Sequence, residues 1–139
     1  MRAYVGLGSN LGDRRATITA AVERLRCHPA VAVVAVSSLI ETAAEPAGSG
    51  PDYLNGVAAV ETVGGVTPEV LLAVLLDIES ALGRRRSVPN APRPIDLDLL
   101  TFGRQVRDTP ALTLPHPRMH RRDFVMKPLR EVSHQEATP

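Results

Sequence analysis

The chain has 139 residues, of which 44% are hydrophobic and 22% charged, and its formal net charge at pH 7 is +1. This length and composition exclude a collagen and a disordered tail protein, and they predict a single domain over residues 1–139. The longest apolar runs, residues 31–36 and 70–76, fall far short of the roughly 20 residues that a membrane-spanning helix needs. There is no apolar signal core, and the single cysteine cannot form an internal disulfide, so we expect a cytoplasmic protein without a membrane partner.

Hydrophobic periodicity and turn residues predict four main strands and two main helices. The expected elements are a strand at 4–7, a helix capped by Asp13 and ending near Cys27, strands at 31–40 and 53–62, a helix capped by Thr67 and ending at Gly83, and a strand at 95–102. A short last helix at 124–132 is expected to bend at Pro128. The order β-α-β-β-α-β predicts an α/β (α+β) protein of ferredoxin-like type, an antiparallel sheet with both main helices packed on one face.

Three glycines, Gly6, Gly8 and Gly12, stand around the end of the first expected strand. They do not form a P-loop, because no Gly-Lys-Ser/Thr follows them, and their spacing does not fit the dinucleotide-binding fingerprint. We therefore expect them to shape a turn.

Asp96 and Asp98 are the strongest candidates for chemistry. In a strand these two side chains share one face while Leu97 points to the other, and residues two apart are separated by roughly 6.5 Å. Paired carboxylates suit Mg²⁺, which binds through one or two carboxylates together with substrate phosphates. The alternative interpretation is the solvated polar face of an ordinary strand.

Arginine supplies fifteen of the sixteen basic residues, and several of them cluster just before the aspartate pair, at 84–86 and at Arg93. The planar guanidinium suits phosphate oxygens, and arginines beside paired carboxylates recur in phosphoryl transfer. The alternative is a solvated loop whose arginines pair with Glu45 or Asp77. A second basic group indicates phosphate or ribose contacts, or else a basic surface turn, and it comprises His116, Arg118, His120, Arg121 and Arg122.

Aromatic residues make up only 3% of the chain, and Tyr53 and Phe124 both lie at the boundaries of expected elements. Such a side chain can stack on a planar heterocycle, or it can simply close the edge of the core. Asn55 shares a strand face with Tyr53, and its amide offers a donor and an acceptor to the edge of a heterocycle.

Taken together, these motifs resemble the family of 6-hydroxymethyl-7,8-dihydropterin pyrophosphokinases. The matching stretches are YVGLGSNLGD at 4–13, SS at 37–38 with ET at 41–42, PDYLN at 51–55, APRPIDLDLL at 91–100 and LPHPRMH at 114–120. They follow the family's order over nearly the whole chain, and the last two blocks are specific to it.

The resemblance implies a ferredoxin-like enzyme of folate biosynthesis that transfers the pyrophosphoryl group of ATP to the hydroxymethyl group of the dihydropterin and releases AMP. It implies two Mg²⁺ ions at Asp96 and Asp98. The pterin ring would stack between Tyr53 and Phe124. Thr42 and Asn55 would contact the edge of the pterin. Catalytic charge neutralisation would come from Arg84, Arg86 and Arg93. Nucleotide contacts are implied for Glu79, His116 and Arg122, and we add Arg118 because it belongs to the same basic group.

We expect a monomer whose partners are ATP and the dihydropterin, not nucleic acid. Residues 87–90 depart from the Arg-Trp pair that many relatives carry there, and this motivates one alternative, a non-catalytic nucleotide- or pterin-binding module of the same fold. A second alternative is a ferredoxin-like RNA-binding domain. Against it, the expected sheet lacks paired aromatics for stacking bases, and the net charge is only +1.

Overall fold

A computed structural model describes residues 1–43, 52–83 and 94–137 of the chain. The elements are β1 (Arg2–Ser9), α1 (Arg14–Arg26), β2 (Val31–Val36), β3 (Ile40–Thr42), β4 (Tyr53–Thr62), α2 (Pro68–Ala81), β5 (Asp96–Phe102), β6 (Arg107–Asp108), β7 (Thr113–Leu114), a 3₁₀ turn (Met119–Arg121) and α3 (Asp123–Ala137). None of the helices in these three segments is long and apolar enough to cross a bilayer.

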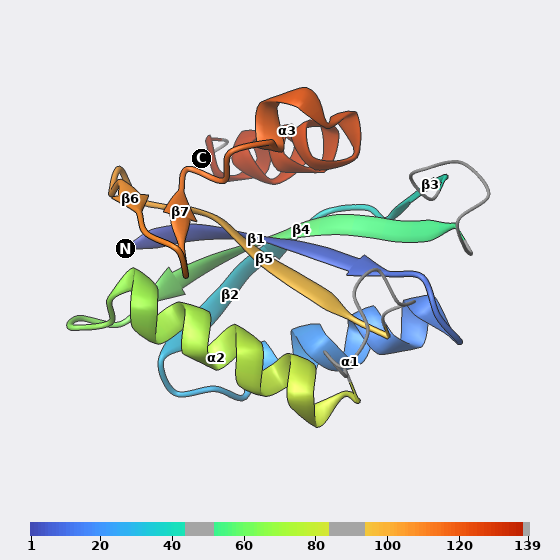
Figure 1. Cartoon of the computed structure of the whole chain (residues 1–139), viewed down its shortest axis with the longest axis horizontal. Coiled ribbons are helices and arrows are strands. Elements are labelled where there is room, and N and C mark those ends of the chain that lie inside the picture. Colours follow the sequence, from blue (N-terminus) through green and yellow to red (C-terminus); the bar gives the residue numbers. More distant parts are fainter. Residues whose placement is uncertain (44–51, 84–93, 138–139) are drawn as a thin grey trace.

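The five-stranded sheet has the order β2-β4-β1-β5, with β3 paired beside β4, and every pairing in it is antiparallel. Helices α1 and α2 cover one face, and α3 lies against the other, where it contacts β4 and β2 (Figure 1). This arrangement confirms the expected ferredoxin-like fold. The short hairpin of β6 and β7 forms a separate sheet beside β5.

Both main helices begin at the predicted caps. The Asp13 carboxylate accepts a hydrogen bond from the amide of Ala16 at 3.1 Å, and the Thr67 hydroxyl accepts one from the amide of Val70 at 3.2 Å. Each bond satisfies one of the first-turn amides, which have no partner within the helix. Pro68 occupies the start of α2, where its missing amide proton costs nothing.

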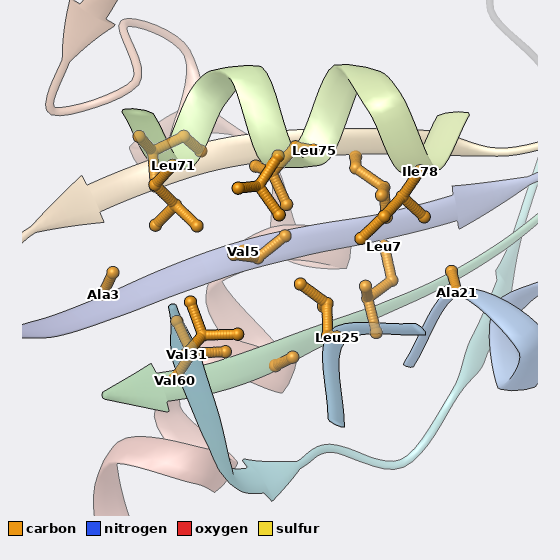
Figure 2. Close-up of a cluster of buried hydrophobic side chains, with 14 of the residues drawn as sticks. Ala3, Val5, Leu7, Ala21, Leu25, Val31, Val60, Leu71, Leu75 and Ile78 are labelled. Atoms are coloured by element: carbon orange, nitrogen blue, oxygen red, sulfur yellow. The ribbon is translucent and has the colours of Figure 1, made fainter. Parts of the chain in front are cut away.

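The main core lies between the sheet and helices α1 and α2. Val5 and Leu7 of β1 point into it and meet Leu25 of α1 with Leu71 and Leu75 of α2, all at most 2% exposed (Figure 2). A smaller apolar cluster lies under α3. Its buried members are Val57, Ala59, Leu100, Met119, Val125 and Val132.

Three predicted boundaries differ from the structure. The first strand continues through Ser9, so Gly6 and Gly8 belong to β1, and of the three glycines only Gly12 adopts a left-handed turn conformation, with φ of 67°. The expected strand at 31–40 is interrupted after Val36. There the Ser37 hydroxyl accepts a hydrogen bond from the amide of Val57 at 2.9 Å, which replaces a regular ladder bond and redirects the chain.

The last helix is also longer than expected, because α3 continues through Pro128 to Ala137. Its turns are held from outside by packing on the sheet, where Val125 and Val132 are buried on either side of the proline. Packing of an amphipathic face therefore outweighs the hydrogen bond that the proline removes.

Arg107 joins the β6–β7 hairpin to the first turn of α2. Its Nε donates to Glu69 Oε2 at 2.8 Å, and its side chain also donates to Gln105 Oε1 at 2.9 Å. The hydrogen bond from Arg107 lowers the pKa of the Glu69 carboxyl below its usual 4.5. A lowered carboxyl pKa stabilises the fold above the unfolded value, and this contribution is lost as the pH falls through the lowered pKa.

We expect Glu69→Gln to lower the melting temperature by less than about 3 °C at pH 7, because the ion pair is solvent-exposed. The difference between variant and parent should be smaller at an acid pH below the lowered pKa of Glu69, where the parent has lost the same charge. Calorimetric melting at both pH values measures this. An equal difference at both would show that the ion pair contributes nothing.

Candidate active site

The candidate site lies on the sheet face that α3 only partly covers. Its floor is β1, whose Gly6 and Gly8 pair with Asp98 and Asp96 of β5. A methyl group added at Gly6 would lie 3.6 Å from Cβ of Asp98, and one added at Gly8 would lie 3.9 Å from Cβ of Asp96. The two glycines therefore leave the space beside both aspartates without side chains from β1.

Asp96 and Asp98 share this face and are half-buried, whereas Leu97 and Leu99 are buried on the opposite face. The alternation predicted from the sequence is thus confirmed. In a strand their Cα atoms are separated by roughly 6.5 Å, which lets two carboxylates face one set of ligands. Two carboxylates on a bare backbone floor form an anionic site of hard oxygen donors.

Glu79 of α2 bonds to the aspartate strand from the opposite face of the sheet. Its Oε2 accepts a hydrogen bond from the amide of Leu97 at 2.8 Å, and the side chain is only 1% exposed. Strand β5 is the edge of the sheet, so its backbone amides that point away from β1 need an acceptor from elsewhere. Glu79 supplies that acceptor for Leu97, the residue between the two aspartates. This contact lies on the helix side of the sheet, and a contact of Glu79 with a nucleotide stays a prediction.

A second polar group lies across β1 from the aspartates. Asn55 of β4 pairs with Gly8, and its Nδ2 donates to the Thr42 hydroxyl of β3 at 2.7 Å. Tyr53 pairs with Thr42 and lies on the same face as Asn55. The structure thus brings three residues predicted to bind one ring next to one another. Two strand spacings, roughly 10 Å, separate Asn55 from Asp96.

His116 borders the same face. Its amide donates to the carbonyl of Leu100 at 2.8 Å, which ties the segment after β7 to β5. Burial lowers the pKa of His116, the charge of Arg122 lowers it further, and Asp96 opposes both. The lowered pKa favours the neutral imidazole, which keeps one N–H donor and one acceptor nitrogen, Nδ1, to which the amide of Arg118 donates.

Arg122 and Phe124 stack against each other where α3 begins. The guanidinium carbon lies 5.4 Å from the ring centroid, a cation–π distance, and both side chains are half-buried. The backbone amide of Arg118 donates to His116 Nδ1 at 3.4 Å, while the residue itself is exposed. The second basic group thus contributes a half-buried histidine and arginine, with Arg118 at the rim.

The predicted residues Arg84, Arg86 and Arg93 lie outside the described residues, as does the 87–90 stretch. Within segments 1–43, 52–83 and 94–137, no three His, Cys, Asp or Glu side chains converge as a metal cluster. Sequence reasoning missed Gly6 and Gly8 as the floor. Their two-residue spacing opposite an Asp-x-Asp strand was the available signal.

The fold and this polar face define a ferredoxin-like α/β protein with paired carboxylates on its open sheet face. A family model described as 7,8-dihydro-6-hydroxymethylpterin-pyrophosphokinase (HPPK) matches residues 4–134. The chain therefore belongs to the HPPK family and is a pyrophosphokinase of folate synthesis.

Curated relatives agree with this family. The 2-amino-4-hydroxy-6-hydroxymethyldihydropteridine pyrophosphokinase of Bacillus subtilis is 44% identical over 135 residues, which cover 96% of this chain and 78% of that protein. The protein of the same name from Pseudomonas aeruginosa is 43% identical over 95% of this chain and 80% of its own length. The folic acid synthesis protein fol1 of Pneumocystis carinii is 38% identical over 94% of this chain, which matches only 17% of that protein.

We expect Glu79→Ala to lower the free energy of unfolding by about 3 kcal/mol, because it leaves the Leu97 amide buried without this acceptor and also opens a cavity. Glu23→Ala is the matched control, since Glu23 is an exposed helical glutamate, and it should change stability by less than about 0.5 kcal/mol. Urea unfolding compares the two. Equal effects would contradict the supporting role of Glu79.

Gly8→Ala and Gly6→Ala form a matched pair on the floor of the site. The added methyl group at Gly8 would press on Asn55 Oδ1 at 3.2 Å, whereas at Gly6 the nearest atom is Leu100 Cδ2 at 3.5 Å, an ordinary contact. We expect Gly8→Ala to cost about 1 kcal/mol of stability and Gly6→Ala about zero or less. Both are measured by urea unfolding, and the reverse order would contradict the packing described for Asn55.

Proposed function

We propose that this pyrophosphokinase moves the pyrophosphoryl group of ATP to 6-hydroxymethyl-7,8-dihydropterin on the glycine-floored face, by which we mean Gly6, Gly8, Asn55, Asp96 and Asp98. One observation carries the proposal. Asn55, which suits the edge of a heterocycle, and the Asp96–Asp98 pair, which suits metal and phosphate, lie on the same face of the sheet. Only β1 lies between them, and at Gly6 and Gly8 it has no side chains.

The pterin would bind at the β3–β4 end of this face. Asn55 keeps one N–H and its carbonyl oxygen for the ring edge after its bond to Thr42, which is the mixed donor and acceptor pattern that a pterin edge needs. Tyr53 and Phe124 would stack on the two sides of the ring. The Arg122 cation lies next to Phe124, and in this arrangement it would put positive charge at the side of the ring that faces the phosphates.

The triphosphate would lie toward β5. His116 and Arg122 would contact it from the segment before α3, with Arg118 at the rim, and Arg84, Arg86 and Arg93 would complete the neutralisation of its charge. The hydroxymethyl oxygen forms a bond to the β-phosphorus while the bond from that phosphorus to the α–β bridging oxygen breaks. AMP leaves with the bridging oxygen, and the proton of the hydroxyl group is released to water. No covalent intermediate on the protein is required, so catalysis is alignment and charge stabilisation.

The donor set fits Mg²⁺. Asp96 and Asp98 are half-buried residues that offer carboxylate oxygens and no softer ligand, and a magnesium site of this kind takes its remaining ligands from phosphates and water. Two bound ions, held by Asp96 and Asp98, would offset the charge of the phosphate oxygens. In this proposal the aspartates hold and orient the ions, and Glu79 keeps the aspartate strand in place.

We further propose that the protein acts as a single-domain cytoplasmic monomer. The two apolar clusters share the one sheet, which supports a single domain. In the described segments the large exposed apolar side chains come from several parts of the chain, which favours a monomer, although two of them share α2. They are Met1, Leu11, Val34, Val63, Val70, Leu76 and Val106.

The direct test measures AMP formed from ATP, Mg²⁺ and 6-hydroxymethyl-7,8-dihydropterin, with each component omitted in turn. AMP formed only in the complete mixture supports the proposal. ADP as the product would show transfer of a single phosphoryl group instead. Saturable binding of both substrates without AMP would favour the non-catalytic binding module.

We expect Asp96→Ala and Asp98→Ala each to reduce AMP formation by at least about a thousandfold while the protein stays folded, because each removes a carboxylate proposed to hold the ions. Asp77→Ala is the matched control, since Asp77 is exposed on α2, and it should retain parental activity. Activity is measured against Mg²⁺ concentration. Near-parental activity in either β5 variant would overturn the metal assignment.

A further inference from the structure

Glu131 of α3 reaches across to the segment between β2 and β3. Its Oε1 accepts two hydrogen bonds from one residue, the backbone amide of Ser38 at 3.0 Å and the Ser38 hydroxyl at 2.9 Å. The two residues are 93 positions apart in the chain. Both bonds end on a carboxylate, and such charge-assisted bonds are stronger than neutral ones.

Ser38 lies just before the strand that carries Thr42. Strand β3 begins at Ile40, is three residues long and pairs with β4, with Thr42 opposite Tyr53. So short a strand at the margin of a sheet is held by few backbone bonds. On its other side the Glu41 carboxylate forms an ion pair with Arg14 of α1. The position of Thr42 thus depends on the Ser38 contact before β3, on the pairing with β4 and on the Glu41–Arg14 ion pair.

Glu131 is also linked to Phe124 through the helix. Residues seven apart lie on the same side of a helix and roughly 10 Å apart along its axis. Pro128 stands between them and cannot donate the usual bond to the carbonyl of Phe124, so the two halves of α3 are joined less firmly than in a regular helix. An external anchor on the second half therefore adds to the placement of the first.

We propose that Glu131 is a positioning residue for the pterin site, which acts through Ser38 to set the distance between Phe124 on α3 and the Thr42–Asn55 pair on the sheet. This inference rests on the proposed roles of Phe124, Thr42 and Asn55. The aspartate end of the phosphate site does not depend on the contact, because Asp96 and Asp98 lie on β5, which Glu79 and β1 hold. Of the phosphate contacts proposed in the described residues, only Arg122 adjoins Phe124. Loss of the contact should therefore weaken pterin binding selectively.

The test measures kcat and both KM values for Glu131→Ala, Glu131→Gln, Ser38→Ala and the control Glu23→Ala. We expect Glu131→Ala to raise the KM for the dihydropterin about tenfold, with the KM for ATP and kcat changed less than about twofold. Glu131→Gln should stay close to the parent, since its amide oxygen accepts the same two bonds. Glu23→Ala removes an exposed helical glutamate elsewhere and should change neither KM.

Ser38→Ala removes only the hydroxyl bond, so it should have a smaller effect, and none further when added to Glu131→Ala. A purely structural role would instead lower the melting temperature and raise both KM values together, or leave both unchanged, and either result overturns the inference. A further variant, Tyr53→Ala, distinguishes an error in the positioning role of Glu131 from an error in the proposed pterin site. If Tyr53→Ala raises the dihydropterin KM and Glu131→Ala does not, only the positioning role is wrong; if neither does, the pterin site itself is misplaced.

Discussion

Strand β1 is the constraint on which the rest of the structure depends. It pairs with β4 from Arg2 to Ser9 and with β5 on its other edge, so it fixes the register of the sheet. Its odd positions, such as Val5 and Leu7, fill the main core, while Gly6 and Gly8 leave the opposite face bare. A slip of one residue would place leucine over the aspartates and glycine in the core, so the register that stabilises the fold also forms the site.

The two faces of the sheet are stabilised by different means. One face is covered by α1 and α2 over a large apolar cluster, and the other is covered at one end by α3 over a smaller one. The polar groups lie where that smaller cluster ends, near Phe124. There the strands are held by backbone pairing and by a few long-range bonds, of which Glu79 to Leu97 is buried and Glu131 to Ser38 is exposed.

What the sequence predicted depended on local pattern. Alternation in β5 placed Asp96 and Asp98 on one face, and the cap residues located both main helices, because these signals involve neighbours in the chain. The break at Ser37 was missed because its cause is a bond to Val57, twenty residues away, within a run of β-branched residues that favours an unbroken strand. The contacts of Glu79 and Glu131 also join distant segments, so no spacing in the sequence marks them.

The reaction makes unequal demands on the two ends of the site. Charge on a transferred pyrophosphoryl group must meet preorganised partners. Asp96 and Asp98, proposed to hold the cations that meet this charge, stand on a strand that pairs with β1 and is bonded to Glu79 of α2. The proposed pterin end has weaker supports, a three-residue strand and the first turn of a helix that contains a proline. Because those two elements do not pair with each other, their spacing must be set by side chains between them, and Glu131 is placed where it can do so. In the proposed site, preorganisation for phosphate would thus come from the backbone, and preorganisation for the ring from side-chain contacts.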